Sequence, residues 1–149
     1  MPGKCSMRSE EGAVAVEAAI AISGFLILIF GMIEFAQVFW TWNTMMLAIE
    51  EGGRYAMVYN AATYPNGPPA ASCSASPATL ANCAVAKANA VLAAYPSPSV
   101  TVSCTVGCGT SPPPTTMTLQ GTFTFNLIPS GLLAYGPITL TRTATVPLD

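Results

Sequence analysis

The chain has 149 residues, of which 52% are hydrophobic and only 8% are charged, and its formal net charge is −2. From Ala56 to the C-terminus, the only Asp, Glu, Lys or Arg residues are Lys87, Arg142 and Asp149, and the whole chain lacks histidine. Acid–base catalysis needs titratable groups beside the reacting bond, and nucleic-acid binding needs clustered Lys and Arg. We therefore expect neither an enzyme nor a nucleic-acid-binding protein. The length suggests one domain with accessory segments.

A long apolar segment follows a short polar N-terminus. Residues 1–12 are mostly polar, and residues 13–33 are apolar except for Glu17. A helix over residues 13–33 is about 31 Å long, which matches a bilayer hydrocarbon core of about 30 Å. A secretory signal peptide is the alternative, but it would need a small-residue cleavage site where Glu34 and Phe35 follow the apolar run. A buried helix of a soluble protein would be shorter and less apolar, so the segment predicts a transmembrane helix.

The helical pattern continues over residues 34–59. Apolar residues repeat at three- and four-residue steps opposite a polar stripe, which predicts an amphipathic continuation of the helix. The apolar positions are Phe35, Val38, Phe39, Trp42, Met46 and Ile49, and the polar positions are Gln37, Thr41, Thr44 and Glu51. Trp40 and Trp42 are expected at the membrane–water interface. Gly52 and Gly53 weaken the helix, which we expect to bend or end near Tyr59.

Residues 60–149 are predicted to form a small domain of one helix and one sheet. After a proline-rich loop, residues 78–95 are alanine-rich and predict a second helix. Residues 100–106, 116–127 and 138–146 alternate apolar and hydroxyl side chains, which is typical of strands. The strands would form an antiparallel sheet with one apolar face, covered by the second helix or by the C-terminal half of the first. The predicted fold class is therefore α+β.

Five cysteines are present, of which Cys5 stands apart near the N-terminus. The other four lie beyond the apolar segment and form an even set, as is typical of an oxidising compartment; they are Cys73, Cys83, Cys104 and Cys108. Because neighbours in sequence lie beside turns, we predict the bridges Cys73–Cys83 and Cys104–Cys108. Other pairings and free thiols are the alternatives. The gap from Cys73 to Cys83 is far too long for a zinc knuckle, so we predict no metal site and no cofactor.

The most specific feature is the junction between the polar leader and the apolar helix. It reads Glu10-Glu11-Gly12-Ala13-Val14-Ala15-Val16-Glu17. A carboxylate inside a bilayer costs roughly 2.5–3.5 kcal/mol at the helix centre and less near the ends, so Glu17 needs a partner. Cleavage after Gly12 would create an α-amino group at Ala13, four residues before Glu17, and the two charges could pair within one chain or between neighbours. The alternative is that the Glu17 side chain extends to the headgroup region.

This junction resembles the type IV pilin superfamily. In that family a membrane peptidase cuts after the last glycine of a leader on the cytoplasmic side, and the fifth mature residue is a glutamate that aligns incoming subunits. Gly12 matches the glycine and Glu17 the glutamate. Together with Gly31-Met32-Ile33-Glu34-Phe35, Asn43-Thr44 and Glu51-Gly52-Gly53-Arg54-Tyr55-Ala56, the junction resembles the TadE-like proteins, which are minor pseudopilins of tight-adherence (Tad/Flp) pilus systems.

The resemblance is dense from residue 12 to residue 59 and general afterwards. It implies a pilin-like subunit that prepilin peptidase cleaves between Gly12 and Ala13. The subunit would then pack with other pilins or pseudopilins and with the pilus-assembly platform, with Glu17 setting the register. Residues 1–12 would be cytoplasmic, residues 13–33 would span the bacterial inner membrane, and residues 60–149 would lie outside the cytoplasm. Ser23 replaces a proline that is frequent in the family, which predicts a straighter helix.

Small residues share one helical face with Glu17. At 100° per residue, this face contains Ala21, Gly24, Leu28 and Gly31. The small side chains of Ala21, Gly24 and Gly31 would let another membrane helix approach closely, although glycine is also simply common in membrane helices. The rival interpretation of the whole chain is a single-span anchored binding module that is neither processed nor assembled. The identity of the first residue of the membrane-extracted protein separates the two interpretations.

Overall fold

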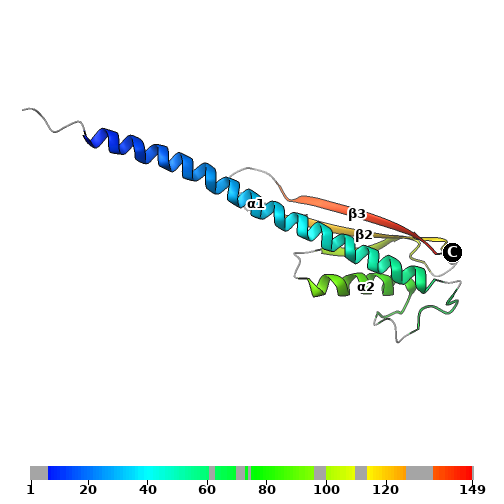
Figure 1. Ribbon diagram of the computed structural model, residues 1–149. Helices are drawn as coiled ribbons and strands as arrows, with labels where there is room; N and C mark the ends of the chain where they lie inside the picture. Colours follow the sequence, from blue (N-terminus) through cyan, green and yellow to red (C-terminus); the bar gives the residue numbers. More distant parts are fainter. Residues whose placement is uncertain are drawn as a thin grey trace, which may run out of the picture. The chain divides into compact units, whose positions relative to one another are not determined.

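The computed structural model describes residues 7–60, 63–69, 73, 75–95, 100–109, 114–126 and 136–148. Within these residues, two helices and three strands follow one another in sequence (Figure 1). They are α1 (Met7–Val58), α2 (Leu80–Ala94), β1 (Val100–Val106), β2 (Thr116–Phe125) and β3 (Ile138–Pro147). The predicted α+β class, with a long first helix, a second helix and a three-stranded antiparallel sheet, is confirmed. The chain divides into two compact units, Met1–Gln37 and Val38–Asp149.

The described part of the first unit is helical throughout. Helix α1 begins at Met7, six residues before the predicted start of the transmembrane helix, and it continues through Gly12. Glycine in a helix interior costs about 1 kcal/mol relative to alanine, which is too little to end a long helix. The predicted leader, residues 1–12, therefore lies partly in α1 and partly outside the described residues. The predicted positions of the leader, the membrane span and the outer domain relative to a membrane stay predictions.

The apolar part of α1 is exposed in the isolated chain. From Gly12 onward, α1 contains an apolar stretch long enough to cross a membrane, and no residue in its most apolar 18-residue window is buried. The core helix of a soluble protein would instead bury most of this surface. A long, bare apolar helix therefore suggests membrane anchoring.

In the second unit, helix α1 runs through Gly52 and Gly53 without interruption and ends at Val58, close to the predicted end. A Cβ atom on Gly52 would lie 2.8 Å from the carbonyl oxygen of Ala84 in α2 and 2.9 Å from Cδ1 of Leu119 in β2. Glycine at position 52 therefore serves close packing of α1 against α2 and the sheet, rather than a bend.

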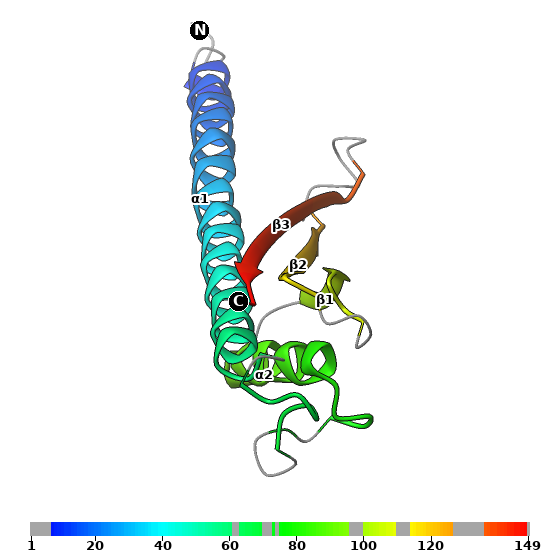
Figure 2. The ribbon, with the colours of Figure 1, turned by 90° about the vertical axis from the view of Figure 1, so that its right-hand side faces the viewer.

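Strand β2 lies at the centre of the sheet, whose order is β1-β2-β3 (Figure 2). Strands β2 and β3 pair antiparallel over ten residues, from Thr116 opposite Pro147 to Phe125 opposite Ile138. The pairing of β1 with β2 shifts register between Cys104 and Val106. The predicted second strand extended to residue 127, which lies outside the described residues. The sheet therefore has one regular ladder and one interrupted ladder.

The two faces of the sheet follow the alternation in sequence. Met117, Leu119 and Phe123 of β2 are almost fully buried. On the other face, the hydroxyl groups of Thr118 and Thr145 lie 2.9 Å apart across the β2–β3 ladder. Such threonine pairs each stabilise a sheet by a few tenths of a kcal/mol to about 1 kcal/mol. The alternation of apolar and hydroxyl residues thus places the core on one face only.

The C-terminal part of α1 covers the apolar face of the sheet, together with α2. The side chains of Met45 and Ile49 lie directly over Gly121 of β2, and both are buried. Helix α2 also contacts β1. Its N-terminus is capped by Thr79, whose hydroxyl oxygen accepts a hydrogen bond of 3.2 Å from the amide of Asn82. Such a cap stabilises a helix by about 1 kcal/mol.

The predicted amphipathic stripes of α1 are wrong in detail. Thr41 and Thr44, assigned to the polar stripe, are buried, whereas Phe39, assigned to the apolar stripe, is 59% exposed. The Thr44 hydroxyl donates a 3.0 Å hydrogen bond to the carbonyl oxygen of Trp40, so its burial leaves no unpaired hydroxyl. The buried face of α1 in the second unit therefore includes hydroxyl residues as well as Met45 and Ile49.

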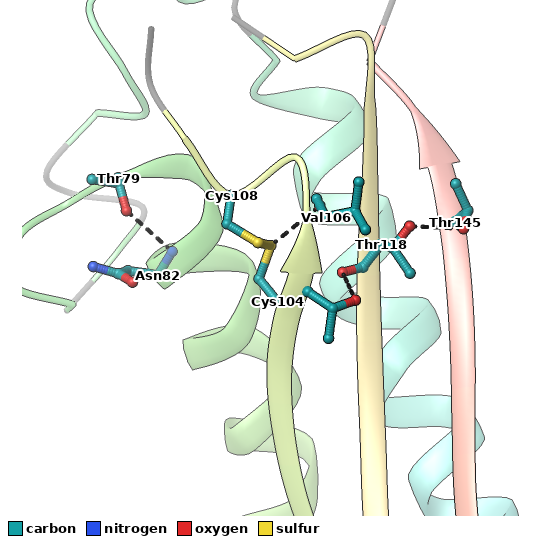
Figure 3. Close-up of a disulfide and its surroundings, with 8 residues drawn as sticks. Thr79, Asn82, Cys104, Val106, Cys108, Thr118 and Thr145 are labelled. Carbon is teal, nitrogen blue, oxygen red and sulfur yellow. Dashed lines mark hydrogen bonds between the residues drawn. A yellow bond between two sulfur atoms is a disulfide. The ribbon is translucent and has the colours of Figure 1, made fainter.

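Two disulfides join the cysteines of the second unit in the pairs that the sequence suggests. The Cα–Cα distances are 5.3 Å for Cys73–Cys83 and 5.8 Å for Cys104–Cys108. The second bridge closes the turn after β1 (Figure 3). In this turn Gly107 has a φ of 71°, and a Cβ atom there would meet the carbonyl oxygen of Thr116. Only glycine fits this position without strain.

Removing the bridges should destabilise the second unit unequally. The sequence separations are 10 for Cys73–Cys83 and 4 for Cys104–Cys108. Loop-closure entropy grows with loop length, so we expect the double alanine variants to lose about 3 and about 2 kcal/mol of unfolding free energy, respectively. Chemical denaturation of the detergent-solubilised protein measures both losses. Non-reducing peptide mapping checks the pairing, and alkylation of all four thiols without reductant would contradict it.

Candidate assembly site

The predicted processing and registry residues lie on exposed α1. Gly12, Ala13 and Glu17 are all exposed, and Glu17 follows Ala13 by about one helical turn, or roughly 6 Å along the axis. Glu17 makes no hydrogen bond or ion pair with any described residue. In the uncleaved chain the Ala13 nitrogen is a helical amide, so the predicted charge pair requires cleavage.

The peptide bond after Gly12 lies in open surroundings. A Cβ atom on Gly12 would meet no atom within 4 Å, and no described side chain covers this part of α1. A protease has to bind its substrate locally extended, so the helix must open there. Glycine lowers the cost of opening by about 1 kcal/mol relative to alanine. The geometry is therefore compatible with cleavage at this bond.

The predicted packing face is also open in the isolated chain. Ala21, Gly24, Leu28 and Gly31 follow Glu17 at steps of four and three residues in one continuous helix, so they share a face with it. Cβ atoms on Gly24 and Gly31 would meet nothing within 4 Å. The Ser23 hydroxyl donates a 2.7 Å hydrogen bond to the carbonyl oxygen of Ala19, which satisfies a polar group on an apolar helix. The role of this face in assembly stays a prediction.

Glu34 differs from the expectation. Its position at the end of the apolar run predicts a carboxylate solvated at the membrane surface, but the residue is only 7% exposed. The residue is therefore shielded from water rather than solvated.

A charged surface between α1 and α2 was not foreseen. An open hollow of about 630 Å³ is lined by Glu51, Arg54, Tyr55, Val58, Tyr59, Pro69 and Lys87. A second hollow of about 520 Å³ shares Glu51 and Lys87 with the first. The Lys87 ammonium lies 5.8 Å from the centroid of the Tyr55 ring, within the range of a cation–π contact. No sequence spacing relates Lys87 to Glu51, because only the packing of α2 on α1 brings them together.

The described residues offer no cluster of metal ligands. Residues 7–60, 63–69, 73, 75–95, 100–109, 114–126 and 136–148 contain no group of three or more His, Cys, Asp or Glu side chains that could hold a metal ion. What the arrangement does present is an exposed apolar helix with one carboxylate near its start, a bare glycine at the predicted cleavage site, and a disulfide-bonded domain.

Comparison with known families gives a match to part of the chain. Residues 12–54 match the family model of the TadE-like proteins. The match begins at Gly12 and includes Glu17, the small-residue face and the helix up to Arg54, so the predicted resemblance to TadE-like proteins is confirmed over this segment. Comparison with curated proteins and with solved structures gives no match. The TadE-like match suggests a pilus-related, pilin-like protein.

Proposed function

We propose that the protein is a minor pseudopilin that is cleaved after Gly12 and assembled through α1 into a tight-adherence type pilus. The TadE-like match carries this proposal, because it starts at the proposed cleavage residue. The match covers an exposed apolar helix in which Glu17 is the sole ionisable side chain between residues 13 and 33. The protein acts by binding other subunits and performs no catalysis itself.

Cleavage converts the Ala13 amide into a cation beside Glu17. The new amine lies about one turn from the carboxylate on α1, so it neutralises Glu17 of its own chain or of an adjacent subunit. In a low-dielectric medium the attraction between the two charges is strong. The charges come into contact at only one axial alignment of neighbouring helices. The pair thereby selects the axial position of an incoming subunit before the small-residue face packs.

The partners follow from this mechanism. A prepilin peptidase in the bacterial inner membrane cuts the Gly12–Ala13 bond, and other pilin or pseudopilin subunits and the assembly platform receive the mature chain. The domain beyond the membrane contacts neighbours outside the cytoplasm, where the two disulfides persist.

Membrane orientation gives one prediction. Lys4 and Arg8 precede the apolar helix, and basic residues favour the cytoplasmic side. An alkaline phosphatase fused after Asp149 should therefore be active outside the cytoplasm, with a cytoplasmic reporter at the same position as the matched control. Activity of the cytoplasmic reporter alone would contradict the orientation.

Replacing Glu17 tests the registry role. Glu17→Ala should leave cleavage largely intact but strand the Ala13 amine. Removing one partner of a buried charge pair typically costs 3–5 kcal/mol, and less near the membrane edge, where water reaches the amine. We expect mature subunit to accumulate unassembled in the source organism, as measured by immunoblot of sheared pili and membranes.

Two controls separate registry from a general loss of charge. Glu50→Ala removes an exposed glutamate of α1 outside the proposed span and should assemble normally, and Glu17→Asp should restore part of the function. A Glu17→Ala chain that is processed and supports normal piliation would refute the registry role and leave Glu17 as a solvated carboxylate near the end of the helix.

A further inference from the structure

The second unit leaves one mixed apolar and charged surface open, on the side of α1 opposite the sheet. Helix α1 contributes Leu47, Glu51, Arg54 and Val58 to the two hollows, and at 100° per residue these lie within an arc of about 60°. That arc lies roughly opposite Met45 and Ile49, whose side chains pack on the sheet. Helix α2 contributes Lys87, Ala90 and Ala94. We call this surface the α1/α2 face.

Charges of both signs lie at the centre of the α1/α2 face. Glu51 and Lys87 line both hollows, and both are exposed. Within the part of the chain that the structure describes, Glu51, Arg54 and Lys87 form no ion pair.

Apolar groups flank these charges. Leu47 is 55% exposed, Val58 59% and Tyr95 42%. Ala90 and Ala94 are also exposed, and their short side chains let another helix come close. Large apolar side chains around central charges, with small residues between them, are a surface suited to helix packing.

We propose that the α1/α2 face binds the same face of a second copy of the chain, about a twofold axis that runs along α1. In this arrangement α1 of each copy lies against α2 of the other. Glu51 then lies opposite Lys87 of the second copy, and the same contact occurs twice. Glu51 and Lys87 line the same two hollows, so they lie at about the same position along α1. A rotation about an axis parallel to α1 does not change that position, so Glu51 of one copy and Lys87 of the other can meet.

Self-complementarity selects a second copy as the partner. A twofold interface brings one patch against itself, so the patch must carry matching groups of both kinds, and the α1/α2 face carries an acid on α1 and a base on α2. An axis along α1 also keeps the α1 helices of both copies parallel, as subunits anchored in one membrane require. The requirement for parallel α1 helices rests on the membrane anchoring in the proposed function and does not depend on cleavage after Gly12.

Charge reversal gives a sharp test with the full-length protein in detergent. We expect the native chain to dimerise, and E51K and K87E each to raise the dimer dissociation constant at least about tenfold, since two attractions become repulsions. An equimolar mixture of differently tagged E51K and K87E chains should form heterodimers with near-native affinity, because both contacts again join a lysine to a glutamate. Analytical ultracentrifugation and two-tag co-purification measure these outcomes.

The control is E50K, which makes the same charge change at the neighbouring exposed position, where Glu50 lines neither hollow. It should dimerise like the native chain. Any of four results would overturn the proposal. The native chain could be monomeric, or the E51K chain could dimerise as well as the native one. The E50K chain could be as impaired as E51K, or the mixture could bind no better than the single variants. A Gly12→Leu chain should dimerise normally, so failure of cleavage and failure of this interface are distinguishable.

Discussion

A Gly12→Leu chain should remain uncleaved and accumulate as a precursor that retains residues 1–12. The peptidase has to bring the backbone at this bond into its active site, and a leucine side chain blocks that approach. Leucine also strengthens the helix by about 1 kcal/mol relative to glycine, which raises the cost of opening α1 around the bond. We expect mature protein to fall at least about tenfold, as measured by immunoblot and intact-mass spectrometry of membrane extracts.

Gly24→Leu is the matched control for this result. It places the same side chain on the same helix, again where a Cβ atom meets nothing within 4 Å, but away from the proposed cleavage bond. Processing of Gly24→Leu should therefore be normal, whereas assembly suffers if the small-residue face packs against other helices. Equal processing of Gly12→Leu and the native chain would show that Gly12 has no role in cleavage.

Gly52→Leu should lower the free energy of unfolding of the second unit by about 3 kcal/mol. A side chain at this position meets the carbonyl oxygen of Ala84 at 2.8 Å, which belongs to the backbone of α2 and cannot rotate away. Overpacking of this kind costs about 1–3 kcal/mol or more, a large part of a typical stability of about 5–15 kcal/mol. Denaturant titration of the detergent-solubilised protein measures the loss.

The neighbouring glycine provides the control. A Cβ atom on Gly53 meets only a methyl group of Val146, at 2.9 Å, and a side-chain methyl can move. Gly53→Ala should therefore be close to neutral, since the gain of about 1 kcal/mol in helix propensity offsets a mild contact. Gly52→Ala should destabilise by about 1–2 kcal/mol. Equal effects of the two alanine variants would contradict the close approach of α1 to α2.

The strands and the junction were predictable because their signals are local. Alternation of threonine with apolar residues sets the sheet face directly, so the β2 face with Met117, Leu119 and Phe123 is visible in the sequence. The glycine-to-glutamate spacing of the junction is likewise a local pattern, and the family match confirms the resemblance that it carries.

The burial pattern of α1 was not predictable, because it depends on contacts distant in sequence. Thr41 and Thr44 are hidden because α1 packs against the rest of the second unit, and the hydroxyl of Thr44 can bond to its own helix backbone. Gly52 resembles a helix breaker in the sequence and becomes a packing position only when Ala84 lies against it. The α1/α2 face arises in the same way, since Glu51 and Lys87 meet only through the fold.

The first residue of the mature protein tests the central claim most directly. The native chain should be expressed in its source organism, extracted from membranes and subjected to N-terminal sequencing. The account predicts Ala13 as the first residue, which places Glu17 as the fifth residue of the mature chain. Recovery of the chain beginning at Met1 would contradict processing and leave the protein as an unprocessed, single-span anchored module.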